Sequence, residues 1–379
     1  MAVRNQAYRS PYGQRKEPAT GRLGRLVLFI TGIVAVAAFG PVAWGIVAGT
    51  HSLPGTTSAF AVAPPGTYAV VARQERAVDI VSVVRADNPA SPLEVARVPH
   101  LEGFTTTGSV DPTGRYVALL TVDAGTPLEP AASLILIDLF GGSLDRLVTG
   151  VDFGWQPLWN ENGTAVIMTR TRQGESGTFI DVLDVALDGA AKLRWSQEAL
   201  GVYPVGWRDQ KLLTVAIDKR GSTLQANGQD LQHLADGFTR DWAIAPDGSA
   251  IAFIEIATQG GLRYVPRVVA LTNDAKVSAQ ALTVGGAEAL GAAWKPGNAP
   301  VFGTVPRSQA NDGDVSAQAV HFDGFDIPVA YSPDGSTLAV VHWNGTGFGD
   351  PGLPSLYLVR GGERYAVPGH REFFGWTYR

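Results

Sequence analysis

Short apolar stretches alternate with polar turns along most of the chain, and one kind of turn recurs. It appears as Ser332-Pro333-Asp334-Gly335 and Ala245-Pro246-Asp247-Gly248, each between two apolar stretches. In such a turn, proline presets the first corner, aspartate bonds its own backbone, and glycine supplies a positive φ. Weaker forms occupy residues 63–66, 111–114, 160–163 and 295–298. The pattern predicts a series of antiparallel hairpins.

The turn glycines are spaced almost evenly. They fall at positions 66, 114, 163, 248, 297 and 335, so the steps are 48, 49, 85, 49 and 38 residues. The step of 85 is close to two periods and predicts a missing turn at Arg208-Asp209-Gln210. A phenylalanine stands ten residues before four of the glycines, at positions 104, 153, 238 and 325. Units of this length predict an all-β fold, a β-propeller of seven blades, with six or eight as alternatives.

The units are expected to begin near Ala59, Phe104, Phe153, Val202, Phe238, Ala287 and Phe325. Units four and six are about ten residues short, and we expect them to lack a fourth strand. The C-terminal segment 374–379 resembles a first strand with no turn after it. A lone strand would leave its backbone groups unpaired, so we expect it to complete unit one. The rival hypothesis is that residues 59–63 fill that place.

A long apolar segment precedes the repeats. Residues 26–48 are 23 residues without a charge, and Arg22 and Arg25 lie just before them. As a helix this segment spans roughly 34 Å, enough to cross a bilayer core of about 30 Å. The flanking arginines predict a cytoplasmic N-terminus and an extracytoplasmic body. Signal-peptide cleavage near Ala59-Phe60-Ala61 is the alternative, but the apolar segment is longer than a typical signal.

The chain is therefore expected to contain four parts: a disordered basic cytoplasmic tail (1–21), a transmembrane helix (22–48), a flexible linker (49–57) and a propeller (58–379). Residues 1–25 carry six Lys or Arg and one Glu, whereas the whole chain has a formal charge of -5. The propeller is thus acidic, which argues against nucleic-acid binding. The chain has no cysteine, which excludes disulfides, thiolate metal sites and a cysteine nucleophile.

Six of the nine tryptophans fall in or beside the predicted first strands, at positions 155, 159, 207, 242, 294 and 376. First strands line the centre of a propeller, so these side chains could form a binding channel. Packing between blades is the favoured interpretation, because large aromatic rings fill wedge-shaped gaps well.

The Pro-Asp-Gly hairpins at 245–254 and 332–341 resemble the repeat of TolB-like β-propellers, and the resemblance covers roughly residues 58–379. It implies a binding platform in the cell envelope, or a domain accessory to a serine peptidase. TolB-like proteins carry an α/β domain before the propeller, where this chain has the apolar segment. The peptidase relatives need an α/β-hydrolase domain after it, and we expect none here.

Sequence motifs for chemistry are missing. No G-x-S-x-G, H-E-x-x-H or G-x-x-x-x-G-K motif occurs. Asn311-Asp312-Gly313-Asp314 has the oxygen-rich look of a calcium loop but lacks the other acidic positions, so a polar turn is favoured. We therefore expect no catalytic, cofactor or metal residues.

The longest loops join second and third strands, and long loops on a rigid scaffold often hold function. The partner-binding residues predicted on them are Asp123, Glu129, Arg307, Asp312, Trp343, Phe348 and Asp350. The favoured function is a membrane-anchored, non-catalytic scaffold in the envelope that binds a protein or glycan. The alternative is a propeller hydrolase with its site in the central channel.

Overall fold

The computed structural model describes residues 51–52, 58–126, 129–175, 177–259, 261–271, 280–281, 288–297, 299–305 and 324–379. The chain divides into two compact units, residues 1–41 and 42–379, and all described residues belong to the second. The predicted tail and transmembrane segment lie outside the described residues. Among the residues that are described, no helix is long and apolar enough to cross a membrane.

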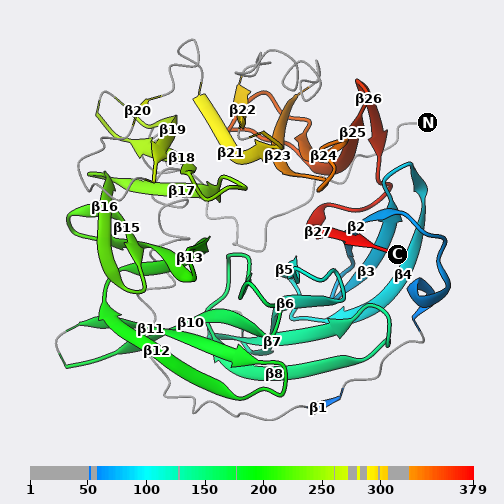
Figure 1. Ribbon diagram of the computed structural model, residues 1–379, viewed down its shortest axis with the longest axis horizontal. Coiled ribbons are helices and arrows are strands. Elements are labelled where there is room, and N and C mark those ends of the chain that lie inside the picture. The colour runs from blue at the N-terminus through cyan, green and yellow to red at the C-terminus, as the bar shows by residue number, and fades with distance from the viewer. Residues whose placement is uncertain are drawn as a thin grey trace, which may run out of the picture. The chain divides into compact units, whose positions relative to one another are not determined.

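The described residues form seven antiparallel sheets that follow one another around a ring (Figure 1). Blade one consists of β2 (Thr67–Gln74), β3 (Val78–Arg85), β4 (Asn88–Pro99) and β27 (Glu372–Tyr378). Blade two consists of β5 (Thr107–Val110), β6 (Tyr116–Gly125), β7 (Pro130–Asp138), β8 (Leu144–Val151) and the outer β1 (His51–Ser52). Blade three consists of β9 (Leu158–Trp159), β10 (Ala165–Gln173), β11 (Thr178–Ala186) and β12 (Ala191–Glu198).

Blade four consists of β13 (Gly201–Arg208), β14 (Lys211–Asp218), β15 (Gly221–Ala226) and β16 (Gln229–Ala235). Blade five consists of β17 (Phe238–Ile244), β18 (Ala250–Ala257), β19 (Arg263–Ala270) and β20 (Gln280–Ala281). The sixth sheet has two strands in the described part, β21 (Glu288–Lys295) and β22 (Ala299–Val305). Blade seven consists of β23 (Phe325–Tyr331), β24 (Thr337–Trp343), β25 (Pro354–Arg360) and β26 (Glu363–Ala366). The β-propeller is thus confirmed, with six sheets of at least four strands and a seventh of two.

The core is divided among the seams between neighbouring sheets. Seven hydrophobic clusters occur among the described residues, and each contains side chains from two adjacent sheets. Successive side chains on a strand point to opposite faces, so Leu119 enters the seam with blade one and Leu120 the seam with blade three. Both faces of a middle strand are therefore buried, which explains its nearly continuous apolar sequence.

The ring is closed by the C-terminal strand, as predicted. The pairing of β27 with β2 is antiparallel and runs from Thr67 opposite Tyr378 to Ala72 opposite Glu372. Gly66 and Arg379 exchange both backbone hydrogen bonds, each 3.0 Å long. The rival hypothesis is wrong, because residues Ala59–Val62 form a short 3-10 helix, η1, which buries Phe60 instead of adding a strand.

The recurring turns are confirmed except at residues 63–66, which follow η1 and do not join two strands. In four of them the glycine amide bonds the carbonyl three residues earlier, for example Gly248 to Ala245 at 2.8 Å and Gly335 to Ser332 at 2.7 Å. The missing turn also lies where it was predicted, with Asp209 and Gln210 at φ 49° and 61°. Two consecutive positive φ angles define the type I′ turn that suits a two-residue hairpin.

The prediction for unit four was wrong, because blade four has a fourth strand, β16. The blade is short because each of its three connections contains two residues: 209–210, 219–220 and 227–228. The prediction that unit six lacks a fourth strand falls partly on residues 306–323, which lie outside the described part.

Three of the first-strand tryptophans link neighbouring blades, as the favoured interpretation predicted. The indole N–H groups of Trp159, Trp207 and Trp294 donate to backbone carbonyls of the preceding blade, at 3.0, 2.8 and 2.9 Å. The accepting residues are Ser109, Trp159 and Ala243. These side chains fasten one blade to the next.

Candidate functional site

One opening of the ring combines the starts of the first strands with the connections between second and third strands, of which the longest in the described part is residues 344–353. In an antiparallel sheet the start of the first strand and the end of the second lie at the same edge. The connections between second and third strands therefore surround this opening, which we call the loop mouth. Of the predicted partner-binding residues, Glu129, Phe348 and Asp350 belong to these connections, and Asp123 and Trp343 lie near the ends of the strands that precede them.

The structure uses Asp123 within blade two. Its carboxylate accepts hydrogen bonds from Ser133 Oγ, at 2.7 Å, and from the guanidinium of Arg146. The side chain of Asp123 is 5% exposed. This residue therefore joins β6, β7 and β8 to one another. Glu129, in contrast, is exposed in a tight turn closed by backbone bonds of 3.1 Å to Thr126.

Arg307 and Asp312 lie outside the described residues. Of the other three predicted residues, Trp343 is the last residue of β24, and Phe348 and Asp350 lie in the connection between β24 and β25. This loop is a compact hairpin whose backbone bonds join Gly345 to Pro351 at 2.8 Å and Thr346 to Asp350 at 3.0 Å. Trp343 and Phe348 are partly buried, and Asp350 is exposed.

Phe348, at the tip of the loop, makes the contacts that define the candidate site. Its ring meets the rings of Phe325 in β23 and Tyr264 in β19, both edge to face with centroids 5.3 Å apart. The three rings join blade seven to blade five at the loop mouth; we call them the mouth cluster. The sequence singled out Phe348, but the partnership with Tyr264 is a contact between residues far apart in the chain, which no local pattern reveals.

Charged groups lie next to the mouth cluster. Burial raises the pKa of Tyr264, and Arg240, Glu288 and Asp241 are close enough to influence it. Arg240 Nε donates to Asp241 Oδ1 at 3.0 Å. The backbone of Asp241 has φ 54°, and its other carboxylate oxygen accepts the amide of Gly291 at 2.8 Å. This bond crosses from the first strand of blade five to that of the sixth sheet and holds the strained residue in place.

A second aromatic group joins blades three, four and five. Tyr203 is stacked on Trp242, with centroids 5.1 Å apart, and meets Trp155 edge to face at 5.8 Å. Burial raises the pKa of the neighbouring Asp152. The Asp152 carboxylate accepts hydrogen bonds from Thr169 Oγ1 and from the amide of Thr171, both at 2.9 Å.

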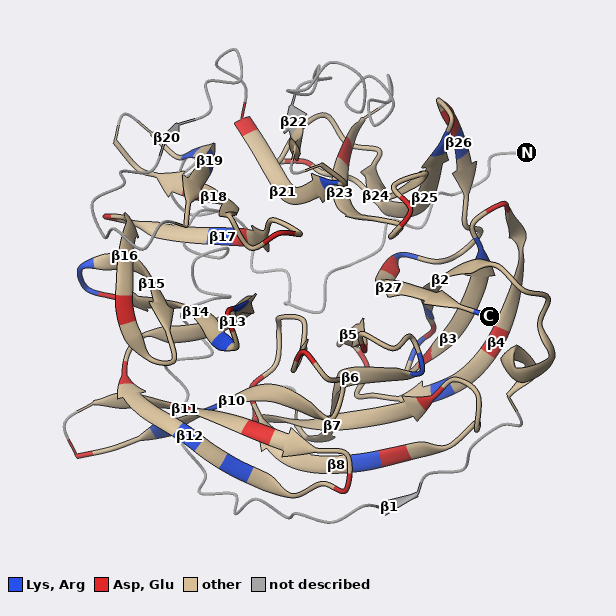
Figure 2. Ribbon diagram, viewed as in Figure 1, with Lys and Arg blue, Asp and Glu red and all other residues tan. Residues whose placement is uncertain are grey.

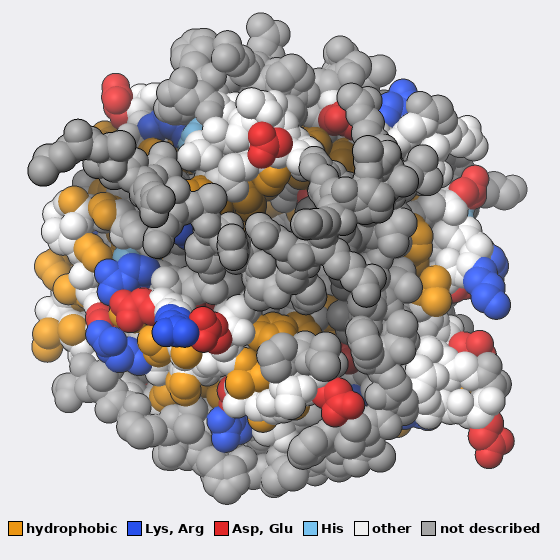
Figure 3. All heavy atoms as spheres, turned by 180° about the vertical axis from the view of Figure 1, so that it is seen from behind, with side chains coloured by type: hydrophobic (Ala, Val, Ile, Leu, Met, Phe, Trp, Pro, Cys, Tyr) orange, Lys and Arg blue, Asp and Glu red, His pale blue; other side chains and the backbone are white. Residues whose placement is uncertain are grey.

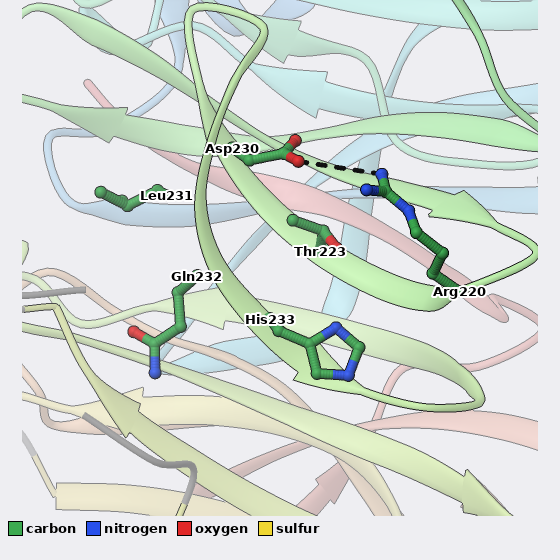
Figure 4. A pocket seen from close by; sticks show the side chains of 6 residues that line it. All are labelled: Arg220, Thr223, Asp230, Leu231, Gln232 and His233. Carbon is green, nitrogen blue, oxygen red and sulfur yellow. Dashed lines mark ion pairs between the residues drawn. The ribbon is translucent and has the colours of Figure 1, made fainter. Parts of the chain in front are cut away.

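A hollow of about 260 Å³ lies on the outer strands of blade four (Figure 4). Its lining residues come from β15, β16 and the turn before β15: Arg220, Thr223, Asp230, Leu231, Gln232 and His233. Arg220 is paired with Asp218 at 2.8 Å and lies 3.8 Å from Asp230. Because the cation is balanced by two local carboxylates, this hollow is a weaker candidate than the mouth cluster.

Most charges of the described strands are balanced inside their own blade. Asp326 accepts hydrogen bonds from Arg364 and lies 2.8 Å from His342 Nδ1, and Asp181 holds Arg170 and Arg172. Acidic and basic side chains are intermixed along the strands and on the face seen from behind (Figures 2 and 3). Within the described residues, no group of three or more His, Asp or Glu side chains could hold a metal ion.

Comparison with known structures finds similar propellers. TolB from Acinetobacter baumannii is 15% identical with a TM-score of 0.50, over 82% of this chain and 66% of that protein. A putative TolB from Agrobacterium tumefaciens is 14% identical with a TM-score of 0.41, over 84% and 99% of the two chains. A prolyl endopeptidase is 12% identical with a TM-score of 0.50, over 79% of this chain and 49% of the peptidase.

At these identities the likeness establishes the fold alone. The fold is that of the TolB-like propellers, as the Pro-Asp-Gly repeat implied. The chain spans just under two thirds of the Acinetobacter protein, at 66%, and about half of the peptidase, at 49%. The sequence matches no family profile and no curated protein sequence.

Proposed function

We propose that this chain is a membrane-anchored, extracytoplasmic propeller that binds an envelope protein or glycan at its loop mouth without catalysing a reaction. The apolar segment 26–48 and the arginines before it support the anchor and its orientation. The closed ring supports the role of scaffold, because each blade is packed against both neighbours and holds its loops in fixed positions. We further infer that the two-stranded sixth sheet is itself a blade, so that the ring has seven.

The observation that carries the binding proposal is the mouth cluster. Its three rings come from two blades and a folded loop, and they stand beside the Arg240–Asp241 pair. Aromatic anchors next to an arginine are typical of binding hot spots, since they combine a large apolar area with a polar handle. A partner at this opening would contact Phe348 and Asp350 on one side and Arg240 on the other.

The test is capture of a partner from membranes with the detergent-solubilised full-length chain as bait. Phe348→Ala should weaken capture about tenfold or more, corresponding to ~1.4 kcal/mol of binding free energy. The matched control is Tyr365→Ala, which removes a 42% exposed ring from the outer strand of blade seven. Both variants should melt as folded proteins. Undiminished capture by a folded Phe348→Ala variant would contradict the proposal.

A hydrolase is the second candidate, and Asp152 is the observation that favours it. A carboxyl group with a raised pKa can act as a general acid. Asp152 also has a structural role that does not require catalysis. Its hydrogen bonds to Thr169 and Thr171 join the segment before β9 to β10. Turnover of a glycoside or lactone that Asp152→Asn abolishes would favour the enzyme over the scaffold.

A further inference from the structure

The segment that leads into the propeller is fastened to the outside of blade two. Strand β1 lies outside β8, with His51 opposite Arg146 and Ser52 opposite Asp145 (Figure 1). Blade two is the only five-stranded sheet in the described part of the chain. The outermost strand of a blade has a free edge, and adding a strand there satisfies its backbone groups.

Two further contacts continue the attachment toward the ring. Ser58 Oγ donates a hydrogen bond to the carbonyl of Leu139, at the turn between β7 and β8. Phe60 is fully buried and packs against Phe140, with ring centroids 5.1 Å apart. The described contacts therefore run from the start of β8, past the turn after β7, into the seam with blade one.

This attachment limits where the membrane can lie. The apolar segment ends at Ala48, and β1 begins at His51. Three residues span at most about 10 Å even when fully extended. If the apolar segment is the anchor, the point where the chain leaves the lipid is within that distance of the first residues of β8. Blades one and three are the neighbours of blade two, and the remaining blades lie farther around the ring from that point (Figure 1).

We propose that the outer edge of blade two is the surface of the propeller that faces the lipid headgroups. The proposal rests on the anchor put forward above. The ring then stands edge-on to the membrane, and both of its openings face sideways along the membrane surface. A partner reaches the loop mouth laterally, as a neighbouring membrane protein or a glycan lying along the surface would.

The chain has no cysteine, so single-cysteine labelling reports one position at a time. Thr149→Cys places a fluorophore two residues before the end of β8. His233→Cys is the matched control, two residues before the end of β16 in blade four, and Glu363→Cys places a label on the outer strand of blade seven. Ser143→Cys, in the exposed turn before β8, replaces Thr149→Cys if that variant melts early.

The labelled full-length proteins are reconstituted in phosphatidylcholine vesicles that contain a lipid with a nitroxide headgroup. The expected result is that the label at position 149 is quenched at least threefold more strongly than those at positions 233 and 363. Flotation with the vesicles but equal quenching at all three positions would overturn the orientation and leave the anchor standing. A chain that does not float with the vesicles would overturn the anchor and the orientation together.

Discussion

Gly248 and Gly335 share one backbone conformation but have different surroundings. Both have φ 71°, in the left-handed region. A Cβ atom built on Gly248 would meet only Arg208 Cγ, at 3.7 Å, which is an ordinary contact. A Cβ atom on Gly335 would lie 2.7 Å from Pro296 Cγ, in the turn of the neighbouring sheet. The turn at Gly335 is thus packed tightly against the turn of the preceding sheet, whereas the turn at Gly248 leaves room for a Cβ atom.

This difference predicts unequal costs for the same substitution. Gly248→Ala should lower the free energy of unfolding by about 1–2 kcal/mol, the cost of a left-handed backbone at an L-residue. Gly335→Ala should cost more, because the proline ring must also shift. Urea unfolding of the two variants measures the difference. Equal losses would mean that the proline moves away without resistance.

Glu372 couples closure of the ring to pH. Burial and the charge of Asp79 raise the pKa of Glu372 from 4.5 to about 7, while Arg371 opposes the shift. The folded state therefore holds a proton that the unfolded state has lost between these pH values. The contribution of Glu372 to the free energy of unfolding is therefore fully present below pH 4.5. It is lost as the pH rises from 4.5 through about 7.

Glu372→Gln should remove this fall. We expect the variant to be more stable than the native protein above pH 7, and the two to converge toward pH 5, in urea midpoints measured from pH 5 to 8.5. Glu363→Gln, at an exposed position of β26, is the control and should follow the native curve. A Glu372→Gln curve parallel to the native one would show that the carboxylate is already charged in the fold.

At the scale of the strand, β27 has the largest structural role. It supplies the inner strand of blade one and contributes Phe373 and Trp376 to the seam with blade seven and Phe374 to the seam with blade two. Thr377 Oγ1 also donates to the carbonyl of Gly114 at 2.5 Å, which ties the strand to the turn of blade two.

Deletion of residues 372–379 should therefore yield aggregated or unfolded protein, since it opens two seams and exposes the edge of β2. Tyr378→Ala is the control, because this side chain is 47% exposed and its loss should change stability by no more than about 0.5 kcal/mol. Thermal melting and size-exclusion chromatography give the readout. A truncated chain that melts like the intact one would contradict the role of β27.

The sequence predicted those elements whose signals are local. The turns at Gly248 and Gly335 and the hairpin at Asp209-Gln210 follow from residue types that only a few backbone shapes accept. The fourth strand of blade four was not predicted, because the short length of the unit was taken to mean fewer strands. The unit is short because its connections contain two residues each, while all four strands are present. The meeting of Phe348 with Tyr264 depends on the curvature of the whole ring, so no pattern near either residue indicates it.

For the molecule as a whole, the orientation across the membrane is the central prediction. Protease added to intact cells or spheroplasts should cut before β1 and leave a membrane fragment of about 50 residues that contains the tail and the apolar segment. An N-terminal tag on the chain allows this short fragment to be detected by immunoblotting. A soluble mature protein that begins near Val62 would instead show signal-peptide cleavage.

Closure by β27 also determines when the fold can be completed during synthesis. Strand β2 begins at Thr67, but its inner partner begins at Glu372. At about 5–20 residues per second, the ribosome needs roughly 15–60 s to make the chain between them. During that interval blade one presents a bare edge and six seams can form before the seventh. In a nascent chain of this protein, the first blade is therefore the part most exposed to strand exchange and to chaperone binding. The exposure ends when β27 has been synthesised and pairs with β2.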